Sequence, residues 1–355
     1  MKKIIGICIL TLLGLAGIAQ TRTTIHKIAF GSCGNQDEKQ PILDLVTRYN
    51  PEFFIFLGDN IYGDTRDMKV LKEKYDKLGA KPEYQRLKAA TKILATWDDH
   101  DYGENDAGRH YPMKAESKAI FLDFFGDSEQ SNRRFYPGIY NSYAYGGLGQ
   151  RVQIIILDTR TFRDDLKPYN GEKKNDDRYF YPLEYSPQTS RDSTLLGEEQ
   201  WKWLEEQLKI PADVRIIASS IQFGAEHNGY EAWANFPHEQ QRFFDVLNRT
   251  KANGVIFISG DVHYSEISVA KREGVYPIYD FTSSGITSTW KFATPNINRI
   301  EGPVMENNFG LLTFDWNADN PTVTMECIDK KNNQRFEYTI PIRQFNIWAG
   351  MILDL

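Results

Sequence analysis

The stretch FFIFLGDNIYGD, residues 53–64, decides the fold that we expect for this chain. Its first five residues are apolar without alternation, which is typical of a strand buried on both faces in an α/β protein. Asp59, Tyr62 and Asp64 follow at once. Because parallel strands in such sheets present functional groups at their carboxyl ends, the stretch predicts a buried strand that opens into a site.

The same pattern, an apolar run that stops on an acid, a histidine or an arginine, occurs three more times. The further runs are ILATWDDHD (93–101), VQIIILDTR (152–160) and VIFISGDVH (255–263). Segments with helical spacing lie between the predicted strands, and this alternation predicts parallel pairing. Beyond residue 263 the pattern changes to strands alone, at 276–281, 309–316, 322–327 and 336–342, which we expect to form an antiparallel second sheet.

The composition is that of a globular protein with a sizeable core. The chain has 355 residues, of which 41% are hydrophobic and 25% charged. The formal net charge is -6, and the sequence has no run of basic residues that could neutralise the phosphates of a nucleic acid. We therefore expect no binding patch for a nucleic-acid backbone.

The N-terminus predicts a signal peptide over residues 1–20. Two lysines precede an apolar segment at residues 4–18, and Ala16, Gly17 and Ala19 suit a cleavage site. The segment is short for a membrane span, although a retained anchor is the alternative. We expect an exported protein, periplasmic or extracellular, with no stable membrane span after cleavage. Residues 21–355 show no linker and no repeat, so we expect a single catalytic domain.

The residues at the predicted strand ends have the composition of a metal site. The set comprises Cys33, Asp59, Tyr62, Asp64, Asp98, Asp99, His100, Asp101, Asp158, Arg160, Gln222, His227, Asp261 and His263. Carboxylates gathered on one surface repel one another unless cations neutralise them. Thiolate, phenolate and imidazole together suit iron or zinc, whereas oxygen ligands suit calcium, magnesium or manganese. Two unlike metals are therefore plausible.

Five motifs carry a resemblance to a known family. They are GSC (31–33), GDNIY (58–62), WDDHD (97–101), LDTR (157–160) and GDVH (260–263). In order and spacing they resemble the alkaline phosphatase D (PhoD-like) family of the calcineurin-like metallophosphoesterase superfamily. The resemblance extends over nearly the whole mature chain. It implies an α/β four-layer sandwich of two facing mixed sheets flanked by helices, and hydrolysis of phosphate mono- or diesters by a metal-activated hydroxide.

The resemblance also implies a ligand set. Its seven members are Cys33, Asp59, Tyr62, Asp99, Gln222, Asp261 and His263. The family pattern assigns iron (Fe3+) to the cysteine, tyrosine and histidine, and calcium to the two later aspartates, with Asp59 bridging the two ions. Zinc, manganese and magnesium stay open. Gln222 would complete the second site, where the superfamily usually has histidine.

Three further residues are catalytic candidates. The resemblance suggests that His100 donates a proton to the leaving oxygen. Arg160 suits equatorial phosphate oxygens, because its guanidinium fork matches phosphate geometry. Asp158 belongs to the same motif. The substrate would be a small phosphate ester, a phospholipid or a cell-wall phosphodiester.

Two alternatives from other classes stay open. Paired carboxylates also serve glycoside hydrolases, which need no metal. A protein of this family that has lost catalysis would be a metal-stabilised binding protein. Any one of the motifs alone is compatible with a turn or a core residue, and the five together in order favour the phosphoesterase.

Overall fold

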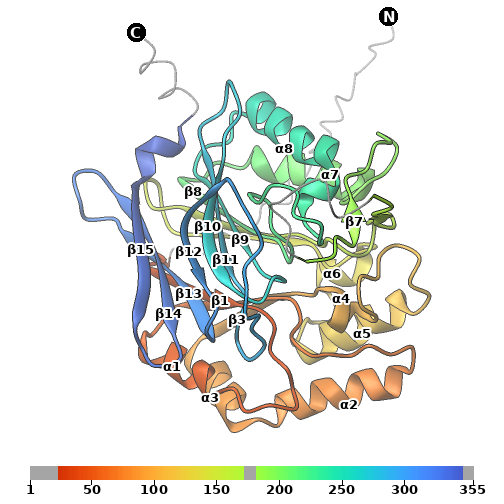
Figure 1. Ribbon diagram of the computed structural model, residues 1–355. Coiled ribbons are helices and arrows are strands. Elements are labelled where there is room, and N and C mark those ends of the chain that lie inside the picture. Colours follow the sequence, from red (N-terminus) through yellow and green to blue (C-terminus); the bar gives the residue numbers. More distant parts are fainter. Residues whose placement is uncertain (1–22, 172–180, 347–355) are drawn as a thin grey trace, which may run out of the picture.

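The computed structural model describes residues 23–171 and 181–346, so the expected signal peptide lies outside the described residues. Two large sheets face each other (Figure 1). The first has the spatial order β15 (Gln334–Pro341), β14 (Thr322–Asp329), β13 (Asn308–Asp315), β1 (Lys27–Gly31), β2 (Phe53–Leu57) and β3 (Lys92–Thr96). The second has the order β12 (Arg299–Val304), β10 (Ser265–Ala270), β11 (Ile278–Ser283), β9 (Val255–Ser259), β8 (Val214–Ala218), β5 (Val152–Ile156) and β4 (Asn141–Tyr145).

Both sheets are mixed. In the first, β1, β2 and β3 are parallel, and β13 adds to β1 in the antiparallel sense. In the second, β5, β8, β9 and β11 are parallel, whereas β4 and β10 are antiparallel to their neighbours. The expected architecture of two facing mixed sheets flanked by helices is confirmed.

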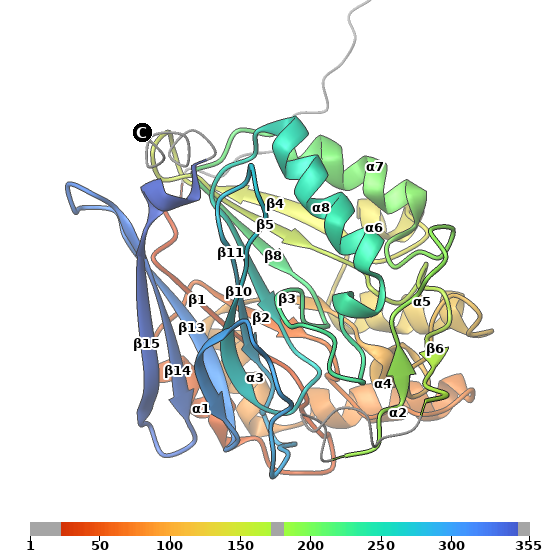
Figure 2. The ribbon, with the colours of Figure 1, turned by 45° about the horizontal axis from the view of Figure 1, so that its top comes forward.

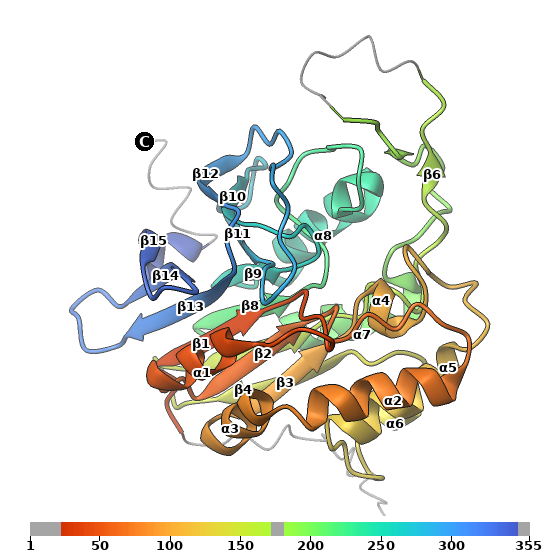
Figure 3. The ribbon, with the colours of Figure 1, turned by 60° about the horizontal axis from the view of Figure 1, so that its bottom comes forward.

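The helices lie outside the two sheets. They are α1 (Pro41–Arg48), α2 (Met68–Gly79), α3 (Pro82–Ala90), α4 (Asp99–Tyr102), α5 (Lys114–Phe124), α6 (Asn132–Phe135), α7 (Gly197–Leu208) and α8 (Pro237–Thr250). Figure 2 shows α7 and α8 over β4, β5 and β8, and Figure 3 shows α1, α2 and α3 over β1–β3. Within the described ranges, no helix combines the length and the apolar character that a membrane crossing needs.

Strand β2 shows how one apolar run serves both of its faces. Phe53, Ile55 and Leu57 belong to the core shared with the second sheet, whereas Phe54 and Phe56 pack with the helices on the other side. Successive side chains of a strand point to opposite faces, so an unbroken apolar run is what a strand between two apolar layers requires. The sequence prediction for this strand is therefore confirmed.

The prediction of a separate antiparallel sheet from the C-terminal strands was wrong. Strands β13, β14 and β15 extend the first sheet from the edge of β1, and β11 pairs in parallel with β9 in the second. Strand β10 was missed, because Ser265, Glu266 and Ser268 make its sequence polar although all its residues are buried. Between β5 and α7 (Gly197–Leu208), a short antiparallel pair forms, β6 (Lys167–Pro168) with β7 (Tyr185–Ser186).

The strand ends of both sheets meet at one place. The end of β1 is tied to the turn after β2, because the amide of Gly34 donates to the carbonyl of Asp59 (2.8 Å). The turn after β2 depends on Gly58, whose φ is +98°. A Cβ atom there would lie 2.4 Å from Cβ of Asp98, in the turn after β3. Only glycine lets these two strand ends approach so closely.

We predict that Gly58→Ala lowers the free energy of unfolding by about 2 kcal/mol or more, since it adds left-handed strain to a steric clash. The matched control is Gly147→Ala, at an exposed turn where a Cβ meets nothing within 4 Å. Urea unfolding of both variants checks the prediction. Equal midpoints for the two variants would contradict it.

Candidate metal centre

Three overlapping groups of side chains could each hold a cation. They are Cys33 with Asp59 and His263, Asp59 with Asp99 and His100, and Asp98 with Asp99 and Asp261. Within each group the potential ligand atoms lie within 4.8 Å of one another. Asp59 and Asp99 each belong to two groups, so the three form one continuous centre.

The backbone at this centre is unusual. Cys33, Asp59, Asp261 and His263 all have φ between +49° and +72°, in the left-handed region. Non-glycine residues seldom adopt this conformation, and it tends to cluster at functional sites. Cys33, Asp59 and Asp261 each lie two residues past the end of a buried strand, and His263 lies in the turn between β9 and β10. The left-handed backbone redirects the chain at these turns.

Several buried carboxylate oxygens have no hydrogen-bond partner among the described residues. They are Oδ1 of Asp59, Oδ2 of Asp98 and Oδ1 of Asp99. Burial, followed by the charges of neighbouring acids, raises the pKa of Asp59 and of Asp261 well above the usual value. Bare buried oxygens and mutually repelling carboxylates are both unfavourable, and bound cations relieve both. The residues present therefore fit a metal centre.

The two sides of the centre differ in their chemistry. On one side, Sγ of Cys33 lies 3.4 Å from Oδ2 of Asp59, and the hydroxyl of Tyr62 lies 3.3 Å from Nε2 of His263. Burial lowers the pKa of His263 to about 4, so its imidazole is neutral and free to coordinate. The other side, formed by Asp98, Asp99 and Asp261, offers only oxygens. These are the donor sets of a softer and a harder ion.

His100 lies beside the centre and is held from two sides. Its Nδ1 is 2.7 Å from Oδ1 of Asp64, and its ring packs 4.5 Å from the ring of Tyr62. Burial opposes protonation, but the bond to Asp64 and the charge of Asp99 outweigh it and raise the pKa of His100 to about 9. Asp64, to which the sequence assigned no role, thus orients and charges this histidine.

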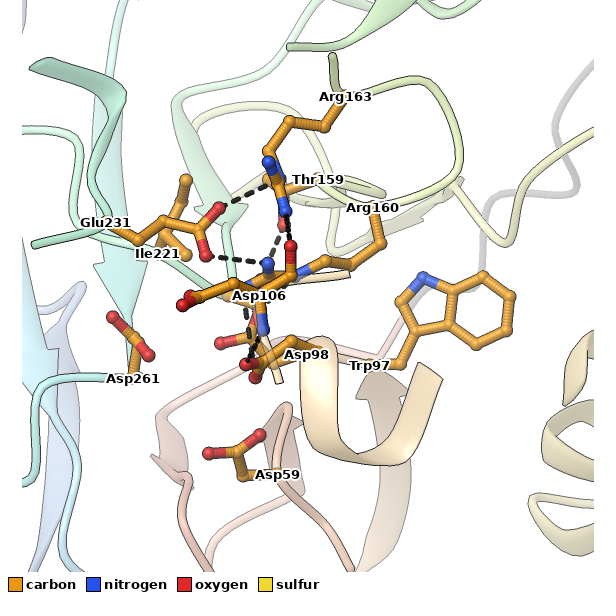
Figure 4. A network of polar contacts seen from close by, with 12 residues as sticks. Asp59, Trp97, Asp98, Asp106, Thr159, Arg160, Arg163, Ile221, Glu231 and Asp261 are labelled. Carbon is orange, nitrogen blue, oxygen red and sulfur yellow. Dashed lines mark hydrogen bonds and ion pairs between the residues drawn. The ribbon is translucent and has the colours of Figure 1, made fainter. Parts of the chain in front are cut away.

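Arg160 does not have the open position expected of a phosphate clamp. Its side chain is fully buried and pairs with Asp98 and, at 2.7 Å, with Oε2 of Glu231. Nη2 also lies 3.9 Å from Oδ1 of Asp99. Glu231 in turn pairs with Arg163 at 2.9 Å, so that it lies between two buried arginines (Figure 4). The guanidinium of Arg160 is engaged by protein carboxylates.

Asp158 also differs from expectation, whereas Gln222 keeps an unpartnered oxygen. Asp158 is buried and accepts hydrogen bonds from the amides of Ile139, Arg160 and Thr161, which makes it an organiser of its own turn. The amide nitrogen of Gln222 donates to Glu266 and Thr282, both at 3.0 Å. Oε1 of Gln222, the atom that would coordinate a cation, is buried and has no hydrogen-bond partner among the described residues.

Sequence reasoning missed the supporting role of Asp101 and missed Glu231 altogether. Asp101 accepts from the amides of Asp59 (3.2 Å) and Asp98 (2.6 Å), and so joins the turns after β2 and β3. Its place in WDDHD marked it as polar but not as a link between strands. Glu231 lies in a loop with no motif, and no local signal identifies it.

The chain is similar in sequence to a curated phosphatase. The chain is 24% identical over 247 residues to alkaline phosphatase D of Bacillus subtilis (strain 168), over 62% of this chain and 40% of that protein. The chain therefore matches less than half the length of this curated relative.

Solved structures share the fold. A structure of PhoD superposes with a TM-score of 0.68 at 17% identity, over 92% of this chain and 71% of that one. GAP50, described as the anchor in the inner membrane complex of Plasmodium, gives 0.55 at 13% identity, over 93% and 95%. A dimetal phosphatase from Danio rerio gives 0.50 at 12% identity, over 90% and 100%.

A family model decides the relationship. The model described as PhoD-like phosphatase matches residues 28–339, which include every candidate ligand and all but the first residue of β1 and the last two of β15 in the two large sheets. The chain belongs to the PhoD-like phosphatase family.

Proposed function

We propose that this protein is an exported, metal-dependent phosphoesterase that hydrolyses phosphate mono- or diesters. The observation that carries the proposal is the convergence of three unpartnered, buried carboxylate oxygens, from Asp59, Asp98 and Asp99, beside a thiol and a neutral imidazole. Family membership supports the chemistry. The apolar segment at residues 4–18 supports export.

Two ions fit the two donor sets. We assign Fe3+ to Cys33, Asp59, Tyr62 and His263, and a calcium ion to an oxygen set that includes Asp59, Asp99 and Asp261. Asp98 joins the second set through its unpartnered Oδ2, and Gln222 remains a candidate member, because its carbonyl oxygen Oε1 is buried without a hydrogen-bond partner and only its NH2 group is engaged. When bound, the cations would act as Lewis acids on the phosphate and lower the pKa of water.

His100 is suited to protonate the leaving oxygen. The bond between its Nδ1 and Asp64 raises the pKa of His100 against the effect of burial, which favours the protonated form, and Nε2 is then the nitrogen that could donate to a leaving oxygen. Asp64 fixes the orientation of the His100 ring, as a carboxylate bonded to the other ring nitrogen does for functional histidines in other proteins.

Arg160 acts by positioning the ligands. Buried among Asp98, Asp99 and Glu231, it neutralises part of the negative charge and fixes one oxygen of Asp98, so that the other faces the centre. Glu231 pairs with the same guanidinium as Asp98 and Asp99, so it takes up part of the attraction that Arg160 exerts on these two carboxylates. Without Glu231, the arginine would compete more strongly with a cation for Asp98 and Asp99.

The central prediction concerns metal content and activity. The purified protein should contain a transition metal and should hydrolyse chromogenic phosphate esters, and chelators should abolish that activity. Paired mono- and diester substrates, together with elemental analysis, make the measurement. Absence of both bound metal and phosphate release would refute the proposal. A metal-bound but inactive protein would indicate a binding protein, and activity on glycosides that resists chelation a glycoside hydrolase.

If Tyr62 binds iron as a phenolate, charge transfer from the phenolate to Fe3+ should give an absorption band in the visible spectrum. Tyr62→Phe should remove this band. The matched control is Tyr49→Phe, whose hydroxyl contacts Asn332 away from the centre. Absorption spectra of the two variants with equal iron content decide the point. A band that survives Tyr62→Phe would exclude the tyrosine as a ligand.

Asp64→Asn should lower kcat by roughly tenfold and leave metal content unchanged, because the substitution removes the carboxylate that orients His100 without touching a ligand. Steady-state kinetics and elemental analysis together test this. An unchanged kcat would show that His100 does not need its partner.

Glu231→Gln should weaken binding of the second cation by about 10- to 100-fold, the range for residues that support metal ligands. The control is Glu239→Gln, another buried glutamate, whose Oε2 accepts from the amides of Leu195 and Leu196 and from Trp201. Both variants should lose stability, but only Glu231→Gln should lose metal affinity. Calcium titration calorimetry would contradict the assignment if both variants bound the ion equally.

A further inference from the structure

Four aromatic side chains form a cluster beside the metal centre, which we call the aromatic wall: Tyr181, Tyr230, Trp290 and Phe292. Trp290 lies 5.2 Å from Tyr230 and 5.2 Å from Phe292, measured between ring centroids. The ring of Tyr181 completes the cluster, because it lies 5.1 Å from the ring of Tyr230 and 5.6 Å from that of Phe292. Three of the four contacts are stacked, with interplanar angles between 18° and 27°.

The wall begins at a proposed metal ligand. The ring of Trp290 lies 5.3 Å from the ring of His263, and the amide of Trp290 donates to the carbonyl of the same histidine (3.1 Å). A phosphate held at the centre would therefore place one of its ester groups close to the wall.

The wall is not part of the closed core. Trp290, Tyr230 and Phe292 keep part of their surface exposed. By contrast, Trp97 and Trp233 are completely buried. Aromatic surface left open beside a polar site is the usual lining of a small-molecule pocket, where a few polar groups fix orientation and rings supply contact area.

Buried polar groups hold the wall in place. Asn228 is buried, and its side chain donates to Thr294 (3.1 Å) and accepts from the amide of Tyr230 (2.9 Å). Its carbonyl accepts from the hydroxyl of Tyr181 (2.6 Å). These bonds join the three segments that carry the four rings, so the rings are organised before a ligand binds.

The loop of Tyr230 is anchored a second time. The next residue, Glu231, pairs with the two buried arginines of Figure 4. Tyr230 and the ligand-supporting network are therefore neighbours on one fixed segment. The distance between the wall and the metal centre is set by the fold itself.

We propose that the aromatic wall binds a planar ring of the substrate, so that the preferred esters are those of nucleosides or phenols rather than of lipids or alkyl alcohols. The inference rests on the proposed function, since the metal centre places the phosphate. Stacking needs no positive charge, which agrees with an acidic site in a protein of net charge -6. Every nucleobase offers a flat face to such a platform.

Calorimetry with phosphonates tests the proposal without turnover. The metal-loaded protein is titrated with methylphosphonate, hexylphosphonate, phenylphosphonate and a phosphonate analogue of adenosine monophosphate. At least one of the two ring-bearing phosphonates should bind about tenfold more tightly than the methyl and hexyl compounds. The two ring-bearing arms distinguish a nucleoside from a simple phenol.

Two variants locate the effect. Phe292→Leu and Tyr230→Leu should each reduce the ring advantage to about threefold or less. Neither side chain touches a proposed metal ligand through its ring in the contacts above. The matched control is Phe135→Leu, on α6, where the side chain is 76% exposed; it should keep the full advantage.

The outcomes separate this inference from the proposed function. Equal binding of all four phosphonates, tighter binding of the hexyl compound, or a ring advantage that survives both wall substitutions would overturn the inference even if the protein hydrolyses phosphate esters. Tighter binding of the ring-bearing phosphonates that is lost in the wall variants would support the inference, even if the protein hydrolyses no phosphate ester.

Discussion

The structure depends on one electrostatic constraint, the burial of several carboxylates within a few ångströms of one another. Asp59, Asp98, Asp99 and Asp261 lie in a site that excludes most water, where like charges repel strongly. Arg160 offsets part of this charge through Asp98 and Asp99. Oδ1 of Asp59, Oδ2 of Asp98 and Oδ1 of Asp99 are left without a hydrogen-bond partner among the described residues, and they mark the candidate cation positions.

This constraint explains the strained turns. Apolar strands from both sheets bring the acids together, and Gly58 allows the turns after β2 and β3 to touch. The left-handed backbone at Asp59 and Asp261 costs folding free energy that the buried core of the sandwich offsets. The core thus supports a site that would be unstable on a smaller scaffold.

The sequence predicted those parts of the structure that are encoded locally. The apolar runs of β2, β3, β5 and β9 and the polar residues that follow them are contiguous, so both the strands and the candidate ligands could be read directly. The pairing of β13 with β1 could not be predicted, because the sequence pattern of a strand shows that the strand is buried but not which neighbouring strand it pairs with. The same holds for Arg160, whose partner Glu231 is 71 residues away.

Glu231 shows what a motif-based interpretation leaves out. Its neighbours carry no pattern, yet its carboxylate lies between Arg160 and Arg163, and the residue before it belongs to the aromatic wall. One loop therefore contributes both to the charge balance at the ligands and to the surface beside them. Both sets of contacts restrain the same backbone, so Tyr230 and Glu231 are held in a fixed relation to each other. Under the proposals made above, one short segment would therefore serve both the substrate surface and the support of the candidate metal ligands.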